Sequence, residues 1–216
     1  MRREAQEVLT GIWVGPSEAG KNLEQLRNAG IGAIVVLRAP SEAVFIKPRF
    51  PDQFEYLIVD IHERADQNLI SLFPKFREFV DQHRSQGHKI LIHDDGGMSR
   101  APAMAAMYLI DKRSLGFEQA LTVIQLRRYC MHLNQGFLRQ LKEFEAMCLA
   151  RDQHKQHQLN APAADSDVVR APRRQREEDD DQPQTLFDHT ASDGTFSDVR
   201  QQKRGREAPD EQEMQE

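Results

Sequence analysis

The sequence predicts an α/β domain with a mostly parallel central sheet flanked by helices, followed by a disordered C-terminal tail. Three short apolar runs rich in β-branched residues alternate with segments whose apolar residues recur at helical spacing. Such alternation is typical of a parallel sheet covered by helices. A change in composition near residue 150 predicts where this domain ends.

The composition divides the chain into residues 1–150 and residues 151–216. The second part holds 14 hydrophobic residues in 66, whereas 39% of the whole chain is hydrophobic. It carries 10 Lys and Arg against 16 Asp and Glu, so the net charge of −5 belongs to this part and the first part is close to neutral. We therefore expect one domain over 1–150, because the second part buries too little apolar surface to offset its chain entropy.

The expected elements begin with two short strands in residues 7–16, which end at a Gly-Pro pair. A helix is expected over 17–29, because Ser17 has the side chain of an N-cap and a glycine follows the last periodic residue. The continuous apolar run 33–37 then predicts a strand buried on both faces of the sheet.

The second half of the domain repeats this alternation. Residues 56–61 and 89–93 predict two more strands, and the helical spacing of apolar residues between them predicts a helix over 69–84. Two further helices are expected near the end of the domain, over 117–129 and 136–149. The order of strands and helices therefore favours a single α/β core.

The turn from the third buried strand into the next helix is the most informative part of the sequence. Residues 94–99 contain two adjacent glycines and lead into a helix expected over 100–109. Such a loop presents backbone N–H groups and the positive end of a helix dipole, which together bind anions. The guanidinium of Arg100 can hold two oxygens of a phosphate. An ordinary strand-to-helix turn explains the glycines equally well.

Residues 93–100, with the sequence HDDGGMSR, resemble the HCxxGxSR signature of the cysteine-based dual specificity phosphatases, with aspartate in place of the cysteine. Residues 127–145 resemble the RRxxxxxNxGFxxQLxxF/YE block of the same family. The resemblance spans 3–150 and implies the cysteine-phosphatase fold. Residues 3–9 and 45–48, together with the missing cysteine, resemble an inactive, pseudophosphatase branch of the family.

The resemblance implies positions for the site residues. The loop that would surround a phosphate, called the cradle here, comprises His93, Asp94, Asp95, Gly96, Gly97, Met98, Ser99 and Arg100. Asp94 stands at the lost nucleophile position, and Glu63 stands where active members carry a general-acid aspartate. Glu63 is also interpretable as a solvated loop carboxylate. We expect His93 to orient the loop through hydrogen bonds to the backbone, while Ser99 has no thiol to assist.

The substitution at Asp94 has a direct physical consequence. Catalysis in such a cradle needs a thiolate that attacks phosphorus and leaves again. A carboxylate instead repels the phosphate, by roughly 4 kcal/mol at ~4 Å and an effective dielectric constant of about 20. One added hydrogen bond returns only ~0.5–1.5 kcal/mol. Asp94 can also accept the loop N–H groups or pair with Arg100. The sequence therefore predicts an inactive site that binds phosphate poorly and uses no metal and no cofactor.

The expected partners are proteins. No apolar run is long enough for a membrane span, and the near-neutral domain argues against nucleic-acid binding. The family resemblance implies phosphoproteins, MAP kinases or F-box receptors of ubiquitin ligases as partners. Short basic clusters at 173–176 and 203–206 are candidate nuclear-import signals, although a solvated tail explains them too. We therefore expect the protein in the cytoplasm and the nucleus.

The leading hypothesis is a pseudophosphatase that regulates or anchors proteins in phosphorylation signalling. The alternative is a residual phosphohydrolase, with Asp94 or water as the nucleophile and Glu63 as the acid. An aspartyl-phosphate mechanism needs a second aspartate two positions along the chain and Mg²⁺, whereas Asp95 follows Asp94 directly. Neither Cys130 nor Cys148 begins a Cys-x5-Arg loop, so neither replaces the missing nucleophile.

Overall fold

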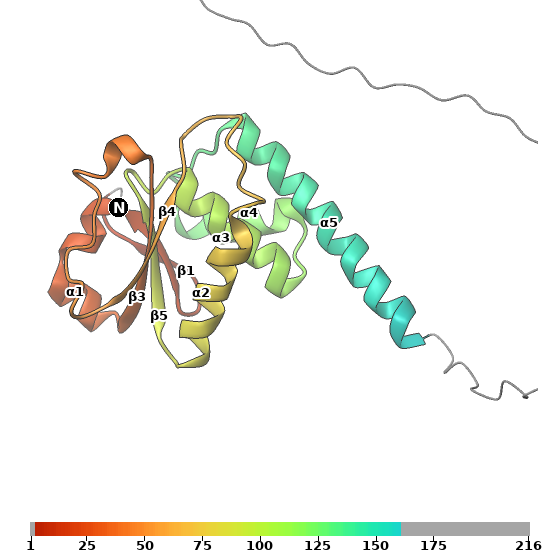
Figure 1. The fold of residues 1–216 in the computed structure, drawn as a ribbon, viewed down its shortest axis with the longest axis horizontal. Helices are drawn as coiled ribbons and strands as arrows, with labels where there is room; N and C mark the ends of the chain where they lie inside the picture. Colours follow the sequence, from red (N-terminus) through yellow and green to blue (C-terminus); the bar gives the residue numbers. More distant parts are fainter. Residues whose placement is uncertain (1–2, 161–216) are drawn as a thin grey trace, which may run out of the picture. The chain divides into compact units, whose positions relative to one another are not determined.

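A computed structural model describes residues 3–160 of the chain (Figure 1). Its strands are β1 (Gln6–Leu9), β2 (Ile12–Pro16), β3 (Ile31–Arg38), β4 (Glu55–Asp60) and β5 (Lys89–Asp94). They form one sheet in the order β1-β2-β5-β3-β4. Only β1 and β2 pair antiparallel within the described residues, and the other pairings are parallel. The predicted α/β domain with a mostly parallel sheet is confirmed.

Helices cover both faces of the sheet. The helical elements are η1 (Ser17–Lys21), α1 (Leu23–Asn28), η2 (Pro40–Glu42), α2 (Phe73–Ser85), α3 (Arg100–Arg113), α4 (Phe117–Arg127) and α5 (Gln135–Asn160). The helices α2 to α5 pack on one face, and η1 and α1 pack on the other (Figure 1). No helix of this part of the chain is both long and apolar enough to cross a membrane.

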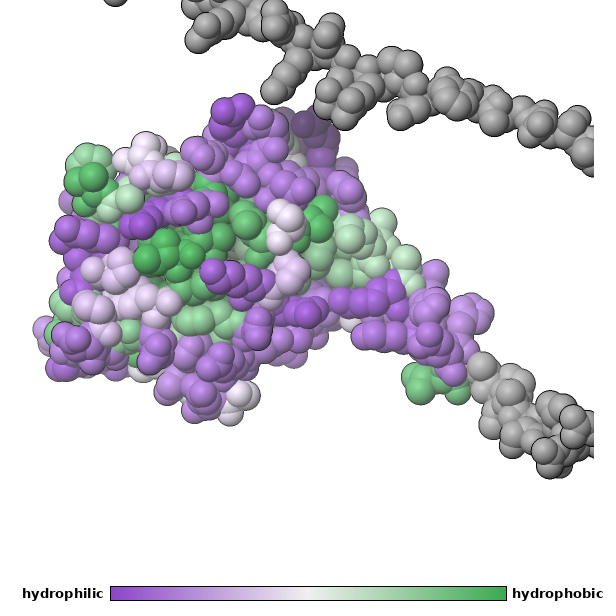
Figure 2. Space-filling model, in the orientation of Figure 1, coloured by the Kyte–Doolittle hydropathy of each residue, from purple (hydrophilic) through white to green (hydrophobic). Residues whose placement is uncertain are grey.

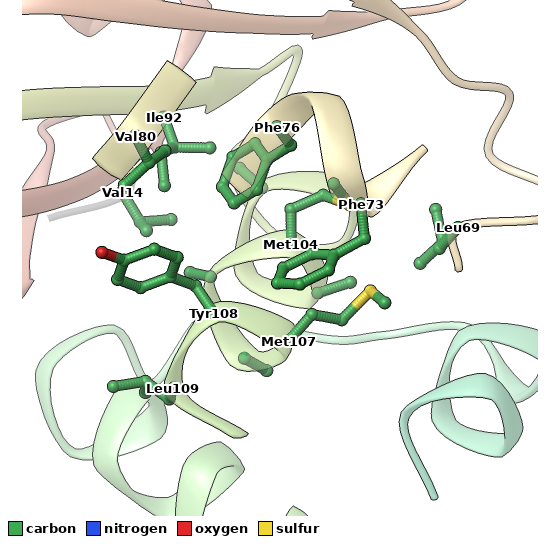
Figure 3. Close-up of a cluster of buried hydrophobic side chains, with 14 of the residues drawn as sticks. Val14, Leu69, Phe73, Phe76, Val80, Ile92, Met104, Met107, Tyr108 and Leu109 are labelled. Carbon is green, nitrogen blue, oxygen red and sulfur yellow. The ribbon is translucent and has the colours of Figure 1, made fainter. Parts of the chain in front are cut away.

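The central strands are buried on both sides, as the continuous apolar run in β3 predicts. Val35 and Leu37 belong to the larger core under α2 to α5, whereas Ile34 and Val36 belong to the smaller core under α1. Successive strand residues point to opposite faces, so the four side chains divide evenly between the two cores. Figure 3 shows the larger core, in which the rings of α2 lie against α3 and the sheet.

The β4 edge of the sheet faces the viewer in Figure 1. Figure 2, in the same orientation, shows hydrophobic residues gathered over this edge and hydrophilic residues around them. Ile58 of β4 is among the large hydrophobic residues that remain partly exposed. The buried residues of this strand, Leu57 and Val59, face the larger core, whereas on the other face only Tyr56 packs, partly buried, against the smaller core.

The helix predicted over residues 17–29 is wrong in one respect, because two separate elements occupy this segment. η1 ends at Lys21, and α1 begins at Leu23. The side chain of Asn22 accepts the backbone N–H of Gln25 at 3.0 Å and caps α1, a role that the sequence analysis gave to Ser17. A side chain at Gly20 would crowd the imidazole of His93, so η1 approaches β5 closely.

The other helix boundaries also differ from the predictions. α2 starts four residues later and α3 ends four residues later than expected, while α4 ends at Arg127. The largest difference is in α5, which passes residue 149 and continues to Asn160. This extension is exposed and mostly hydrophilic (Figure 2). Its polar composition suits a solvent-facing helix as well as a tail. The remaining predicted tail, residues 161–216, lies outside the described residues, so its disorder and the boundary at 150 stay predictions.

An ion pair anchors the start of this extension to the core. Arg151 Nη1 lies 2.6 Å from Oδ1 of Asp111, whose side chain is buried on α3. Arg77 and Lys112 approach the same carboxylate less closely, at 3.8 and 3.9 Å. Arg151 is therefore the main partner of a buried charge.

Arg151→Ala should lower the free energy of unfolding by about 1 kcal/mol, since the Asp111 carboxylate loses its closest partner and the arginine is only partly buried. Urea denaturation of the full chain measures this change. Arg139→Ala, an exposed arginine on the same helix, is the control and should change the midpoint little. Equal midpoints for the two variants would contradict the anchoring role of Arg151.

Candidate functional site

The carboxyl end of β5, the loop after it and the start of α3 surround a pocket of about 340 Å³. The shape of the loop depends on Gly97, whose φ is +64°. A Cβ at this position would lie 2.3 Å from the carbonyl carbon of Gly15 on β2, a distance that no side chain tolerates. Glycine is therefore required both for the backbone conformation and for the close approach of β2.

The carboxylate of Asp94 lies inside the loop and is only 2% exposed. One oxygen accepts the backbone N–H of Ala101 at 2.9 Å, and the other accepts the N–H of Gly97. These are the donors that a glycine-bearing loop and a helix N-terminus offer to an anion. Burial raises the pKa of Asp94, and Glu63 acts in the same direction, while the two N–H groups and Arg100 oppose them.

The second contact expected for Asp94, a hydrogen bond with Arg100, is not formed. The two Nη atoms of Arg100 donate instead to both oxygens of Glu42, at 2.6 and 3.0 Å. Nη1 also lies 3.2 Å from the carbonyl oxygen of Ile61, and Nε lies 3.6 Å from Oε2 of Glu63. The bidentate fork that would hold a phosphate is therefore occupied by a carboxylate of the same chain.

Glu42 is a site residue that the sequence analysis missed. It ends η2, just after β3, and its side chain also accepts the N–H of Ala39 at 2.8 Å. Burial raises the pKa of Glu42, but the hydrogen bonds from Arg100 and Ala39 outweigh this effect and lower it. The missed signal was positional, because the carboxyl ends of β3 and β5 meet at one edge of a parallel sheet.

Glu63 is held beside the cradle. Its Oε1 accepts hydrogen bonds from Ser99 Oγ at 2.6 Å and from Asn134 Nδ2 at 2.7 Å. These contacts favour the site position over the interpretation of Glu63 as a freely solvated carboxylate. Asn134 precedes α5 and belongs to the family block of residues 127–145.

Arg128 fixes the loop from the opposite side. It is almost fully buried after α4 and donates to the carbonyl oxygens of Gly96, at 3.0 Å, and of Gly97. It also donates to the carbonyl oxygen of Glu4 at 2.9 Å and to the side chain of Gln6. Arg128 was not predicted as a site residue, since nothing in its sequence neighbours distinguishes it from the exposed Arg127.

His93 lies behind the loop, and the backbone of Asp94 acts on its ring as a hydrogen-bond partner. Its Nδ1 atom is buried, without a hydrogen bond of ordinary geometry among residues 3–160. The pKa of His93 is lowered to about 4, mainly by burial. The backbone of Asp94 opposes this effect, and the charge of Lys21 adds to it. The ring is therefore neutral near pH 7 and contributes packing against Gly20.

The structure brings most of the predicted site residues to one pocket. Of those predicted, its lining includes Glu63, Asp94, Asp95, Gly96, Met98, Ser99 and Arg100. His132 and Asn134 line it as well, and neither was predicted as a site residue. Three of the predicted lining residues carry a carboxylate, and Glu42 adds a fourth next to Arg100. The pocket therefore combines an anion-binding backbone with a surplus of negative side chains.

Comparison with known proteins identifies the family. The profile of the dual specificity phosphatase catalytic domain matches residues 12–147. This chain belongs to the dual specificity phosphatase family. Within that family it is 40% identical over 153 residues to the human serine/threonine/tyrosine-interacting protein, covering 70% of this chain and 69% of the human one. The mouse protein of the same name is 38% identical over 190 residues, covering 84% of each chain.

Solved dual specificity phosphatase structures confirm the predicted fold. The crystal structure of the human tyrosine phosphatase-like serine/threonine/tyrosine-interacting protein has a TM-score of 0.67 and 38% identity, and covers 68% of this chain and 99% of that chain. Human DUSP28, at 22% identity, has a TM-score of 0.62 and covers 67% of this chain and 95% of that chain. The branch of the family that residues 3–9 and 45–48 resemble is that of the serine/threonine/tyrosine-interacting proteins, and the similarity to these proteins confirms this resemblance.

The buried imidazole of His93 predicts a loss of stability in acid. The folded chain binds this proton only near pH 4, and the unfolded chain binds it near pH 6.5. The unfolded state therefore holds more protons between these values, so stability falls as the pH drops below 6.5 and is unaffected by this group above it. We expect the loss to reach about 2 kcal/mol at pH 5.

Urea midpoints of the wild type and of His93→Asn, each measured at pH 7 and pH 5, isolate this effect from other titrating groups. The wild type should lose more stability than the variant over this interval. Parallel losses in the two proteins would show that His93 titrates in the same range in the folded and unfolded states.

Proposed function

We propose that this chain is a catalytically inactive member of the dual specificity phosphatase family, a pseudophosphatase that regulates phosphorylation signalling by binding proteins. The observation that carries the proposal is the buried Asp94 carboxylate, which accepts the N–H groups of Gly97 and Ala101. In this position the chain has no thiolate to attack phosphorus. The cradle also already contains an anion, which repels the phosphate of a substrate.

The contacts of Arg100 support the same proposal. A phosphate that uses both Nη groups of Arg100 must first displace Glu42, which holds them at 2.6 and 3.0 Å. It must also approach Glu63, 3.6 Å from Nε of Arg100, and Asp95 at the same pocket. Each of these carboxylates lowers the affinity for a dianion.

Protein binding is the role that we propose for the retained fold. The similar human and mouse proteins are named serine/threonine/tyrosine-interacting proteins. Phosphoproteins, MAP kinases and F-box receptors of ubiquitin ligases are the partner classes that the inactive branch of the family implies, and the cytoplasm and nucleus are the compartments we propose. Capture of partners by the full chain and by a chain ending at residue 160 distinguishes contacts of the domain from contacts of the remaining residues.

The wild type should hydrolyse para-nitrophenyl phosphate no faster than buffer, and Arg100→Ala should behave in the same way, because no thiolate is present in the cradle. Release of nitrophenolate measures the rate. The alternative function, a residual phosphohydrolase that uses Asp94 or water with Glu63, requires turnover that both Arg100→Ala and Glu63→Gln abolish. Turnover with that dependence would overturn the proposed function.

Replacement of Asp94 by cysteine tests how far the cradle remains competent. We expect Asp94→Cys alone to restore little hydrolysis, because Glu42 still holds both Nη groups of Arg100. Adding Glu42→Gln removes the competing charge and should raise the rate about tenfold or more, the effect of one charge-assisted hydrogen bond. Equal rates for the single and double variants would mean that Glu42 does not compete with phosphate.

A further inference from the structure

A second concavity lies beside the cradle at the carboxyl end of the sheet. Its lining includes Ser17, Lys21, Lys47, Arg49, Tyr56 and His93. These residues come from η1, from the connection between β3 and β4, from β4 itself and from β5. The proposed function leaves all of them without a role in binding.

The concavity is rich in positive charge. Within residues 3–160, neither Lys47 nor Arg49 forms a salt bridge or a side-chain hydrogen bond. The third cation, Lys21, lies 2.5 Å from an oxygen of Glu18, which is itself largely exposed. The pKa of Glu18 is lowered mainly by the hydrogen bond from Lys21, and the charge of Arg49 contributes a smaller lowering. Two of the three cations therefore lack a close counter-charge.

The wall of the concavity on β5 is the imidazole of His93, which is 4% exposed. The ring edge with Nε2 faces Gly20 of η1, where a Cβ would lie 3.2 Å from Nε2. The ring therefore closes the inner side of the concavity, while the cations surround its rim.

An apolar surface adjoins the cations. Phe45 also lines the concavity and is 71% exposed, and the preceding Val44 is 73% exposed. Large side chains exposed to this degree next to a charged concavity are typical of surfaces that contact another protein. A ligand that fits both features carries a negative group beside an apolar one.

We propose that this concavity binds a phosphorylated side chain of a partner protein, with an apolar neighbour of that side chain packed on Phe45. Lys21 and the pair Lys47 and Arg49 approach one small concavity from two separate segments, an arrangement that suits a compact dianion better than an extended run of carboxylates. The enclosed volume, about 10 Å³, holds one water at most, so the phosphoryl oxygens contact the cations at the rim.

The inference rests on the proposed protein-binding function and adds the place and the chemistry of recognition. In the cradle, Asp94 and Glu42 occupy the groups that would hold a phosphate. The adjacent concavity offers Lys47 and Arg49, which form no salt bridge within the described residues, beside Lys21, which pairs with the exposed Glu18. We therefore expect phosphate to bind in this concavity, beside the carboxyl end of β5, and not in the cradle.

The test uses the full chain and a fluorescein-labelled peptide with phosphothreonine between two leucines, measured by fluorescence anisotropy. The unphosphorylated peptide and the same peptide with glutamate replacing phosphothreonine are compared. Lys47→Ala with Arg49→Ala should weaken binding of the phosphopeptide about tenfold or more, the loss expected from removing charge-assisted contacts. Lys75→Ala with Arg139→Ala is the matched control of equal charge on α2 and α5, and should leave binding unchanged.

A second readout does not depend on the peptide. Titration of the wild type with inorganic phosphate should shift the NMR signals of the His93 ring, and the Lys47 and Arg49 double variant should show no such shift. Binding lost in Arg100→Ala and kept in the double variant would place phosphate in the cradle and overturn the inference. Equal affinity for the glutamate peptide, or no binding and no shift of His93, would overturn it as well. The proposed function would then still stand on partner capture and on the absence of turnover.

Discussion

A buried carboxylate that accepts two backbone N–H groups determines the character of this molecule. Asp94 lies where the loop after β5 and the first turn of α3 direct their donors, with one amide from Gly97 and one from Ala101. Left without an acceptor, those buried N–H groups would destabilise the loop. Because the chain supplies its own acceptor, the loop keeps an anion-binding conformation that needs no bound ligand. The loop therefore keeps the conformation of a phosphate-binding loop although aspartate stands in place of the cysteine.

The same principle explains the surroundings of the loop. Arg100, the residue that would bind the phosphate of a substrate, is paired with Glu42. Glu63 accepts hydrogen bonds from Ser99 and Asn134. Each of these polar groups already has a partner from another segment of the chain. The carboxylates in this arrangement support the proposal that the cradle binds phosphate poorly. In the neighbouring concavity, by contrast, Lys47 and Arg49 form no salt bridge within the described residues.

The features that local patterns encode were predictable from the sequence. The parallel strands follow from β-branched runs such as 33–37, and the position of the cradle follows from the glycines and Arg100 at the end of a buried strand. Even the burial of Asp94 among the loop amides was one of two expected contacts. These predictions needed only the period of the apolar residues and the order of the elements.

The features that depend on distant segments were not predictable in this way. Glu42 and Arg128 look like ordinary surface residues in the sequence, because only the folded sheet brings them to the cradle. The close approach of η1 to His93 at Gly20 and the pairing of Arg151 on α5 with Asp111 on α3 also join segments that are far apart in the sequence. No periodicity records such contacts, since each joins one side chain to an unrelated part of the chain.

The bonds of Arg128 have a consequence for how the molecule reaches this state. The guanidinium of Arg128 joins the loop after β5 to the carbonyl oxygen of Glu4, which lies 124 positions before Arg128 in the chain. The entropy of closing so long a segment must be overcome before this bond forms. We therefore expect the loop to acquire its final shape only after the first strand and the end of α4 have come together around it.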